Sequence, residues 1–177
     1  RLWCWLCVYY SSTHSIRSIT GVTVQNPIHQ TKLFLLFIAS TLILSACTGT
    51  RPKQLGEAQT SLQVCPSSPN CVSSLKDEDK DHFIESISYT NKSSTHEALV
   101  KAINSDESAE LIIKTDQYIY AEYTSAIMRY VDDVEFLFDD NQQRIHVRSA
   151  SRLGHSDFGV NRDRIEQIRS QLNDGAL

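Results

Sequence analysis

Apolar and polar residues alternate with a period of two along much of the second half of the chain, and this pattern predicts β-strands. In the clearest run, Val134, Phe136 and Phe138 fall on one face. Asp133 and Glu135 fall on the opposite face of the same run. The predicted strands are residues 83–89, 111–114, 118–124, 131–138 and 144–149.

A polar turn at residues 139–143 joins the last two predicted strands and indicates a hairpin. Pairing Phe136 with Val147 keeps the apolar faces together, whereas a slip of one residue would mix the two faces, so the pattern favours this register. The same register sets Glu135 directly across from Arg148. An exposed ion pair between these two residues would contribute about 0.2–1 kcal/mol.

Two segments have the period of an amphipathic helix. The first begins at Ser94 and ends near residue 104, and its Ser94 and Glu97 have the spacing of a capping box. The second follows a polar loop, and there we expect Asn161 to be the N-cap. Val160 and Ile165 have the spacing of a hydrophobic staple around that cap.

The order of these elements, β-α-β-β-β-β-α, predicts one α+β domain over residues 65–177. We expect an antiparallel sheet of four to five strands with both helices packed on its apolar face. A chain of 177 residues is long enough for one such domain with appended segments.

Residues 30–46 have the organisation of a secretory signal peptide. Lys32 provides a positive charge, and the apolar run at residues 33–44 is too short to cross a bilayer of about 30 Å as a helix. The sequence Leu-Ser-Ala-Cys, which ends at Cys47, resembles the bacterial lipoprotein signal, so we expect Cys47 to be lipidated and to anchor the protein. By resemblance to Gram-negative sorting, Thr48 favours the outer membrane, with the domain facing the periplasm. The alternatives are an ordinary signal peptide and a buried helix.

Two further segments flank this signal. Residues 1–29 contain no methionine, because the only one in the chain is Met128. We interpret them as an upstream segment outside the native protein, from a translation begun before the true start; the alternative is that the sequence is a fragment. Their Cys4 and Cys7 have C-x-x-C spacing, but no second pair completes a metal site. Residues 47–64 are polar without a sustained period, which predicts a tether between lipid and domain.

Cys65 and Cys71 follow the predicted tether. Two nearby cysteines in an exported protein are commonly oxidised together, so we expect a structural disulfide between them. Closing this short loop would contribute on the order of 2 kcal/mol in the chain-entropy model. A metal site would need more ligands than His82 supplies, and a catalytic redox pair usually has two intervening residues rather than five.

The acidic residues are distributed unevenly along the chain. Three of the 17 basic residues and none of the 21 acidic residues precede Cys47, which leaves 14 basic and 21 acidic residues from there on, a net charge of −7. Binding to a phosphate backbone needs a positive surface. Nucleic acid is therefore not an expected partner.

The stretch from residue 148 to residue 162 has more hydrogen-bonding side chains than a simple connection needs. Arginines surrounded by serine and asparagine can hold a carboxylate or phosphate by forked hydrogen bonds, which makes this stretch the candidate binding site. Alternatively, Asp157, Asp132 and Asp133 could satisfy the arginines and pin the loop to the sheet. The candidate residues are Arg148, Ser149, Ser151, Arg152, Ser156, Asp157, Asn161 and Arg162.

Four segments together resemble the bacterial domain-of-unknown-function family 1499. They are residues 65–74 (CPSSPNCVSS), 130–136 (YVDDVEF), 147–154 (VRSASRLG) and 156–162 (SDFGVNR). The resemblance spans roughly residues 65–172 and implies an envelope lipoprotein, but it implies no activity. Members of the family commonly have an aromatic residue where this chain has His155, which argues against a special role for that histidine.

Catalytic arrangements find little support in the sequence. His155, Ser156 and Asp157 are adjacent on one loop, where a nucleophile, a base and an orienting acid rarely reach one another. No G-x-S-x-G motif accompanies them.

The carboxylates of the predicted strand give a similar result. Asp132 points away from Asp133 and Glu135 along a strand, so these three residues do not form a metal site locally. We therefore expect a lipid-anchored envelope protein that binds a partner or a small anionic ligand, without catalysis, metal or cofactor. An envelope hydrolase and a purely structural or assembly factor are the alternatives.

Overall fold

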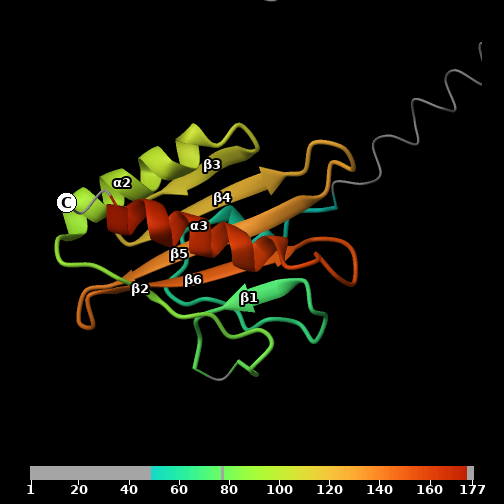
Figure 1. Ribbon diagram of the computed structural model, residues 1–177, viewed down its shortest axis with the longest axis horizontal. Helices are drawn as coiled ribbons and strands as arrows, with labels where there is room; N and C mark the ends of the chain where they lie inside the picture. Colours follow the sequence, from blue (N-terminus) through green and yellow to red (C-terminus); the bar gives the residue numbers. More distant parts are fainter. Residues whose placement is uncertain (1–48, 77, 175–177) are drawn as a thin grey trace, which may run out of the picture. The chain divides into compact units, whose positions relative to one another are not determined.

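In the computed structural model, which describes residues 49–76 and 78–174, two α-helices cover one face of an antiparallel sheet (Figure 1). The main strand order is β1-β6-β5-β4-β3, and β2 also pairs with β6. The α+β prediction is confirmed, with six strands instead of four or five. The elements are η1 (Lys53–Gly56), β1 (Cys71–Ser73), β2 (Ile87–Ser88), α2 (Lys92–Ser105), β3 (Ala109–Lys114), β4 (Tyr118–Thr124), β5 (Val131–Asp139), β6 (Arg144–Ser151) and α3 (Val160–Asp174).

The predicted register of the β5–β6 hairpin is confirmed. Phe136 lies opposite Val147, and Glu135 lies opposite Arg148. The period of two then gives the sheet two chemically different faces. We call them the helix-covered face, toward α2 and α3, and the strap-covered face, which is opposite.

The helix-covered face carries the main hydrophobic core. Leu99 and Ile103 of α2 and Ile165 of α3 are fully buried against the sheet. Helix α2 begins two residues earlier than predicted, because the Asn91 side chain accepts a hydrogen bond from the Ser94 amide at 3.1 Å. Asn91 is therefore the N-cap, and the predicted capping box at Ser94 was wrong.

Helix α3 also begins differently from the prediction. The Asp157 carboxylate accepts a hydrogen bond from the Asn161 amide at 2.8 Å, so this amide of the first turn, which has no partner within the helix, is satisfied. Asn161 lies inside the helix, and its own side chain is buried. Val160 is 49% exposed, so the predicted staple with Ile165 does not hold α3.

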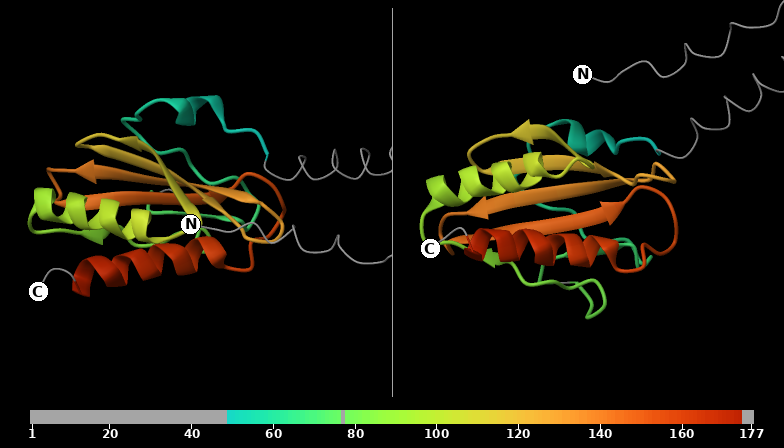
Figure 2. Two further views of the ribbon diagram at one scale, coloured as in Figure 1. Left: turned by 90° about the horizontal axis from the view of Figure 1, so that it is seen from above. Right: turned by 45° about the horizontal axis from the view of Figure 1, so that its top comes forward.

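The strap-covered face is closed by residues 49–64, which we call the N-terminal strap. Figure 2 shows η1, which lies within the strap, on the side of the sheet opposite α2 and α3. Leu55 and Leu62 of the strap are 1% and 7% exposed and pack with Tyr118 and Tyr120 of β4. The expected tether over residues 47–64 therefore packs on the domain from residue 49 onward.

Several smaller predictions can also be compared with the structure. Cys65 and Cys71 form the expected disulfide, with 5.7 Å between their Cα atoms. The predicted strand at residues 83–89 shortens to β2, and the three-residue strand β1 was missed. Within the described ranges, no helix is long and apolar enough to cross a membrane. The predicted signal peptide, Cys47 and residues 1–29 lie outside the described residues.

Candidate functional site

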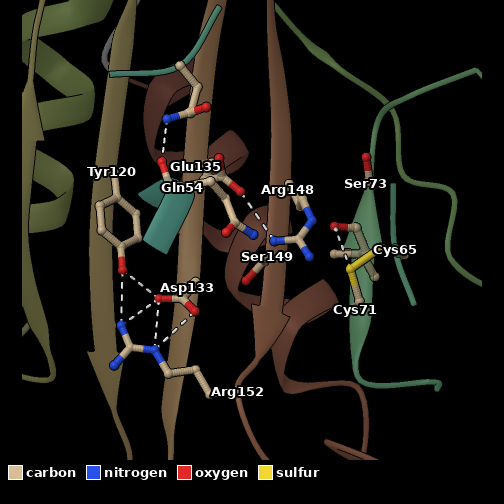
Figure 3. Close-up of polar contacts among 12 residues, drawn as sticks. Gln54, Cys65, Cys71, Ser73, Tyr120, Asp133, Glu135, Arg148, Ser149 and Arg152 are labelled. Atoms are coloured by element: carbon tan, nitrogen blue, oxygen red, sulfur yellow. Dashed lines mark hydrogen bonds and ion pairs between the residues drawn. A yellow bond between two sulfur atoms is a disulfide. The ribbon is translucent and has the colours of Figure 1, made fainter. Parts of the chain in front are cut away.

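On the strap-covered face, an ionic network is built around Arg152, which directly follows β6 (Figure 3). Its Nε donates to Asp133 Oδ2 at 3.0 Å and its Nη2 to Asp133 Oδ1 at 2.6 Å, a forked arrangement. The same Nη2 lies 2.5 Å from Glu122 Oε1 and donates to the Tyr120 hydroxyl at 3.0 Å. Arg51 of the strap donates to the Glu122 carboxylate, so the network joins the strap to the sheet.

A second charged group lies beside it on the same face. Arg148 Nη1 donates to Glu135 Oε2 at 3.2 Å (Figure 3). The Tyr118 hydroxyl donates to Glu135 Oε1 at 2.8 Å. The Glu135 side chain is completely buried, and the Arg148 side chain is 13% exposed. The expected cross-strand pair is therefore present but buried. Among the described residues, the buried Nε of Arg148 has no hydrogen-bond partner.

Burial controls the titration of these groups. It raises the pKa of the Glu135 carboxyl, against the opposing charge of Arg148. Burial also raises the pKa of the Tyr120 hydroxyl, and its hydrogen bond to Asp133 adds to the effect. Burial alone would lower the pKa of the Arg152 guanidinium, but hydrogen bonds to Asp133 and Glu122 outweigh it and raise that pKa. Tyr120 therefore stays protonated and Arg152 stays charged at neutral pH.

A different network lies between α3 and the helix-covered face. Asn161 Nδ2 donates to the Asn70 carbonyl and to Ser151 Oγ, both at 3.1 Å. Ser149 Oγ donates to Asn161 Oδ1 at 2.5 Å. Arg164 Nη1 donates to that same oxygen at 2.8 Å. Because Asn161 and Ser149 are fully buried, these contacts fix α3 to β6.

Arg164 extends this network to a cavity between α2 and α3. Its Nη2 donates to Asp132 Oδ2 at 2.7 Å, and its guanidinium lies 4.5 Å from the centre of the Tyr123 ring. The cavity has a volume of about 280 Å³. Its polar lining includes Asp106, Glu107, Tyr123, Arg164, Gln167 and Gln171. Residues of both helices and of strand β4 line it.

The remaining predicted residues belong to the loop after β6 and the start of α3. Ser156 Oγ accepts a hydrogen bond from the Phe158 amide at 3.3 Å. The Asp157 carboxylate accepts from the Gly159 amide at 3.0 Å, in addition to its bond at the start of α3. Arg162 Nη2 donates to the Asp81 carbonyl at 2.8 Å.

The eight predicted binding residues do not form one cluster. Consecutive residues of β6 point to opposite faces, so the sheet separates Arg148 from Ser149. Arg152 is paired with Asp133, as in the structural alternative, whereas Arg148 is paired with Glu135. Ligand binding by any of the eight stays a prediction. They are placed as follows: Arg148 and Arg152 on the strap-covered face, Ser149, Ser151 and Asn161 on the helix-covered face, and Ser156, Asp157 and Arg162 around the start of α3.

The sequence interpretation missed the residues that line the cavity. Arg164, Gln167 and Gln171 follow one another at intervals of three and four residues along α3. They run beside the buried stripe that contains Ile165 and Ile168. A polar stripe at helical spacing next to an apolar one was the available signal.

A catalytic arrangement receives little support from the contacts. Ser74 Oγ lies 3.4 Å from His146 Nδ1, and His146 Nε2 lies 3.9 Å from Asp139 Oδ2. Ser74 is only 5% exposed, and its Oγ accepts a hydrogen bond from the Val147 amide at 2.8 Å. This hydroxyl is therefore committed to the fold and closed to a substrate. No group of three or more metal-ligating side chains comes together in the described part of the chain.

The chain belongs to the family described as "Protein of unknown function (DUF1499)", whose sequence model matches residues 61–172. This match confirms the resemblance inferred from the four segments. It reaches from the end of the strap to the last buried residue of α3. No curated protein matches the chain. The family description gives no activity, so a function has to be argued from the site.

Proposed function

We propose that this DUF1499 member is a lipid-anchored protein of the cell envelope that acts by binding a small polar ligand, without catalysis. The lipoprotein-like sequence that ends at Cys47 supports the anchor, and Thr48 supports the outer membrane facing the periplasm. The cavity between α2 and α3 is the observation that carries the binding function.

The polar groups of this cavity favour a neutral or positively charged ligand. Arg164 already donates to Asp132 and to Asn161, so it has little capacity left for an anion. Gln167 and Gln171 are exposed at the cavity and each offers an amide donor and an acceptor. The carboxylates of Asp106 and Glu107, which lie in the same lining, repel anions and attract amines. This chemistry replaces the expected anionic ligand with one rich in hydroxyl or amino groups.

The cavity's size limits what it can hold. Its volume of about 280 Å³ lies just below the range of roughly 300–1,000 Å³ that is common for small-molecule sites. The Arg164 guanidinium covers one face of the Tyr123 ring, and this contact holds both side chains in place in the cavity wall. A ligand the size of one sugar ring fits these limits.

The proposal is tested with three sugars of one ring type: glucose, glucosamine and glucose 6-phosphate. Ligand-detected saturation-transfer NMR should show contact with glucose and glucosamine and markedly weaker contact with the phosphate ester. The Gln167→Ala/Gln171→Ala variant should lose this contact, and the Gln63→Ala variant, altered at an exposed glutamine outside the cavity, should keep it. Contact that is strongest for the phosphate ester, or that survives the double substitution, contradicts the proposal.

The hydrolase alternative has less support. The hydroxyl of Ser74 is buried beside its histidine, and Ser156 Oγ accepts a backbone hydrogen bond in a turn. The alternative of a purely structural or assembly factor is supported by the networks around Arg152 and Asn161, in which polar side chains bind one another. It predicts no contact with any of the three sugars.

A further inference from the structure

Exposed apolar side chains are concentrated in two loops at one end of the sheet. Among the described residues, seven large apolar side chains are exposed, and six of them lie in or directly beside residues 125–130 and 152–159. Phe158 is 95% exposed and Ile127 is 90% exposed. The six residues are Ile127, Met128, Tyr130, Leu153, Phe158 and Val160.

The two loops share one end of the sheet because β5 begins where β6 ends. Asp132 pairs with Ser151, and the Arg152 amide donates to the Val131 carbonyl at 3.0 Å. Figure 1 shows the β4–β5 loop and the loop before α3 at the same edge of the drawing. We call this part of the molecule, residues 125–130 and 152–160, the apolar end.

The backbone holds Phe158 outward at an energetic cost. Its φ is +56°, in the left-handed region that bulky residues rarely adopt. Gly159, the next residue, also has a positive φ of +88°. Folding alone gives no reason to display an aromatic ring in this way, because the ring is almost fully in solvent. A surface that this ring contacts would supply the reason.

The strap enters the domain at this same end. Gly49 has a φ of +66°, and a Cβ added to it would lie 3.0 Å from Arg152 Cβ and 3.2 Å from Leu153 Cγ. Leu153 belongs to the apolar end. In the sequence one residue separates Gly49 from Cys47, and two successive Cα–Cα steps of about 3.8 Å give this piece of chain a maximum reach of roughly 8 Å.

We propose that the apolar end lies in the interfacial layer of the membrane leaflet that holds the lipid on Cys47. This inference rests on the lipid anchor of the proposed function. The short distance along the chain brings the lipid to the six apolar side chains and leaves no space for a spacer. Side chains of this kind, with a tyrosine among them, bind at the boundary between headgroups and acyl chains.

The charges around the apolar end indicate that contact is mainly apolar. Arg129 is the one basic side chain on the β4–β5 loop, and it is exposed. In the other loop Arg152 is paired with Asp133, and the Asp157 carboxylate is used at the start of α3. The contact should therefore persist on zwitterionic lipid and depend weakly on salt.

A single-tryptophan experiment on the full chain tests this contact. Trp3 and Trp5 are the only tryptophans, so replacing both with Phe gives a background free of tryptophan. In this background the Phe158→Trp variant is produced in a bacterial host that acylates lipoproteins, and it is reconstituted into vesicles of phosphatidylethanolamine and phosphatidylglycerol. The matched control is Asn141→Trp, an exposed position in the β5–β6 turn at the other end of the sheet.

Lipids brominated in their acyl chains should quench the tryptophan of Phe158→Trp at least about threefold more than that of Asn141→Trp, since an interfacial side chain reaches about 5–10 Å into the boundary. Its emission should also shift to shorter wavelength. Equal quenching at both positions overturns the inference. A shift without bromine quenching also overturns it, because a protein surface or a second copy then covers the apolar end.

Mass spectrometry of the N-terminus separates this inference from the proposed function. An acylated Cys47 without quenching at position 158 overturns the membrane contact and leaves the anchor intact. Quenching by bromolipid with an unmodified Cys47 overturns the anchor and leaves the membrane contact standing.

Discussion

Among the described residues, seventeen buried apolar side chains form one cluster between the sheet and helices α2 and α3, whereas four form the cluster on the strap-covered face, where ion pairs lie beside them. Neighbouring residues of one strand take part in both. Phe136 is buried in the helix-covered core, and Glu135, the residue before it, is buried on the opposite face with Arg148. The alternation of side chains along β5 therefore places apolar residues in one interior and charged residues in the other.

The two interiors respond differently to the loss of one side chain. In the apolar core, truncation removes contacts and leaves a cavity, but no charge loses its partner. On the strap-covered face, truncation of Arg152 removes the arginine partner of the buried Asp133 carboxylate and one of the two arginine partners of Glu122. Directional pairs also tie the strap to the sheet, through Arg51 and Glu122. The strap-covered face is thus held by fewer contacts than the apolar core, and the loss of any one of them should cost more stability.

The largest effect is expected from Arg152→Ala. Its side chain is only 6% exposed and pairs with both Asp133 and Glu122. Breaking a buried pair by removing one partner costs about 3–5 kcal/mol in the free energy of unfolding, measured by urea denaturation. As a matched control, Arg144→Ala at an exposed arginine should change stability by less than about 0.5 kcal/mol. A loss below about 1 kcal/mol for Arg152→Ala would show that water compensates the carboxylates.

A somewhat smaller loss is expected from Leu55→Ala in the strap. Removing a fully buried leucine costs about 2–4 kcal/mol, and here the loss should fall mainly on the strap. The rate of trypsin cleavage after Lys53, followed by mass spectrometry, should therefore increase by a larger factor than the rate of global unfolding. Leu99→Ala in α2 is the matched control, since it should lower global stability without favouring that cleavage. Equal acceleration in both variants would mean that the strap unfolds only together with the rest.

The parts of the fold that could be predicted are those with a strong period. Strand β4 has the predicted bounds, and the β5–β6 register is as predicted, because a one-residue slip would place Phe136 opposite a polar neighbour. The disulfide also followed from the short spacing between Cys65 and Cys71. In each case a local feature had only one favourable arrangement.

The parts that could not be predicted depend on contacts between distant segments. Only Leu55 and Leu62 mark the strap as buried, and two leucines seven residues apart in a polar segment show no period. The eight candidate residues are divided between two faces and a loop for another reason. The alternation that predicted β6 also separates Arg148 from Ser149, but the site prediction grouped these residues by their nearness in sequence. Applying the strand period to residues 148–152 would have divided the group correctly.

The smallest effect, and the one that depends on pH, is expected from Glu122→Gln. Burial alone would raise the pKa of the Glu122 carboxyl, but hydrogen bonds from Arg51, Arg152 and Tyr120 outweigh it and hold this pKa below its ordinary value of 4.5. A carboxyl with a lowered pKa in the folded state adds stability at a pH above its unfolded pKa. At neutral pH the substitution should therefore cost roughly 1.5–2 kcal/mol, the lower end of the range for hydrogen bonds to a charged group.

This cost should disappear in acid, because the wild-type contribution is lost as the pH falls through the folded pKa of Glu122. Urea denaturation of both proteins from pH 7 to about pH 3 should show curves that converge below about pH 4.5. The raised pKa of Glu135 has the opposite sign, but it is common to both proteins and cancels in the difference. Glu97→Gln, at an exposed glutamate of α2, should follow the wild type throughout. Parallel curves for Glu122→Gln would mean that Glu122 holds the strap by shape and packing rather than by its charge.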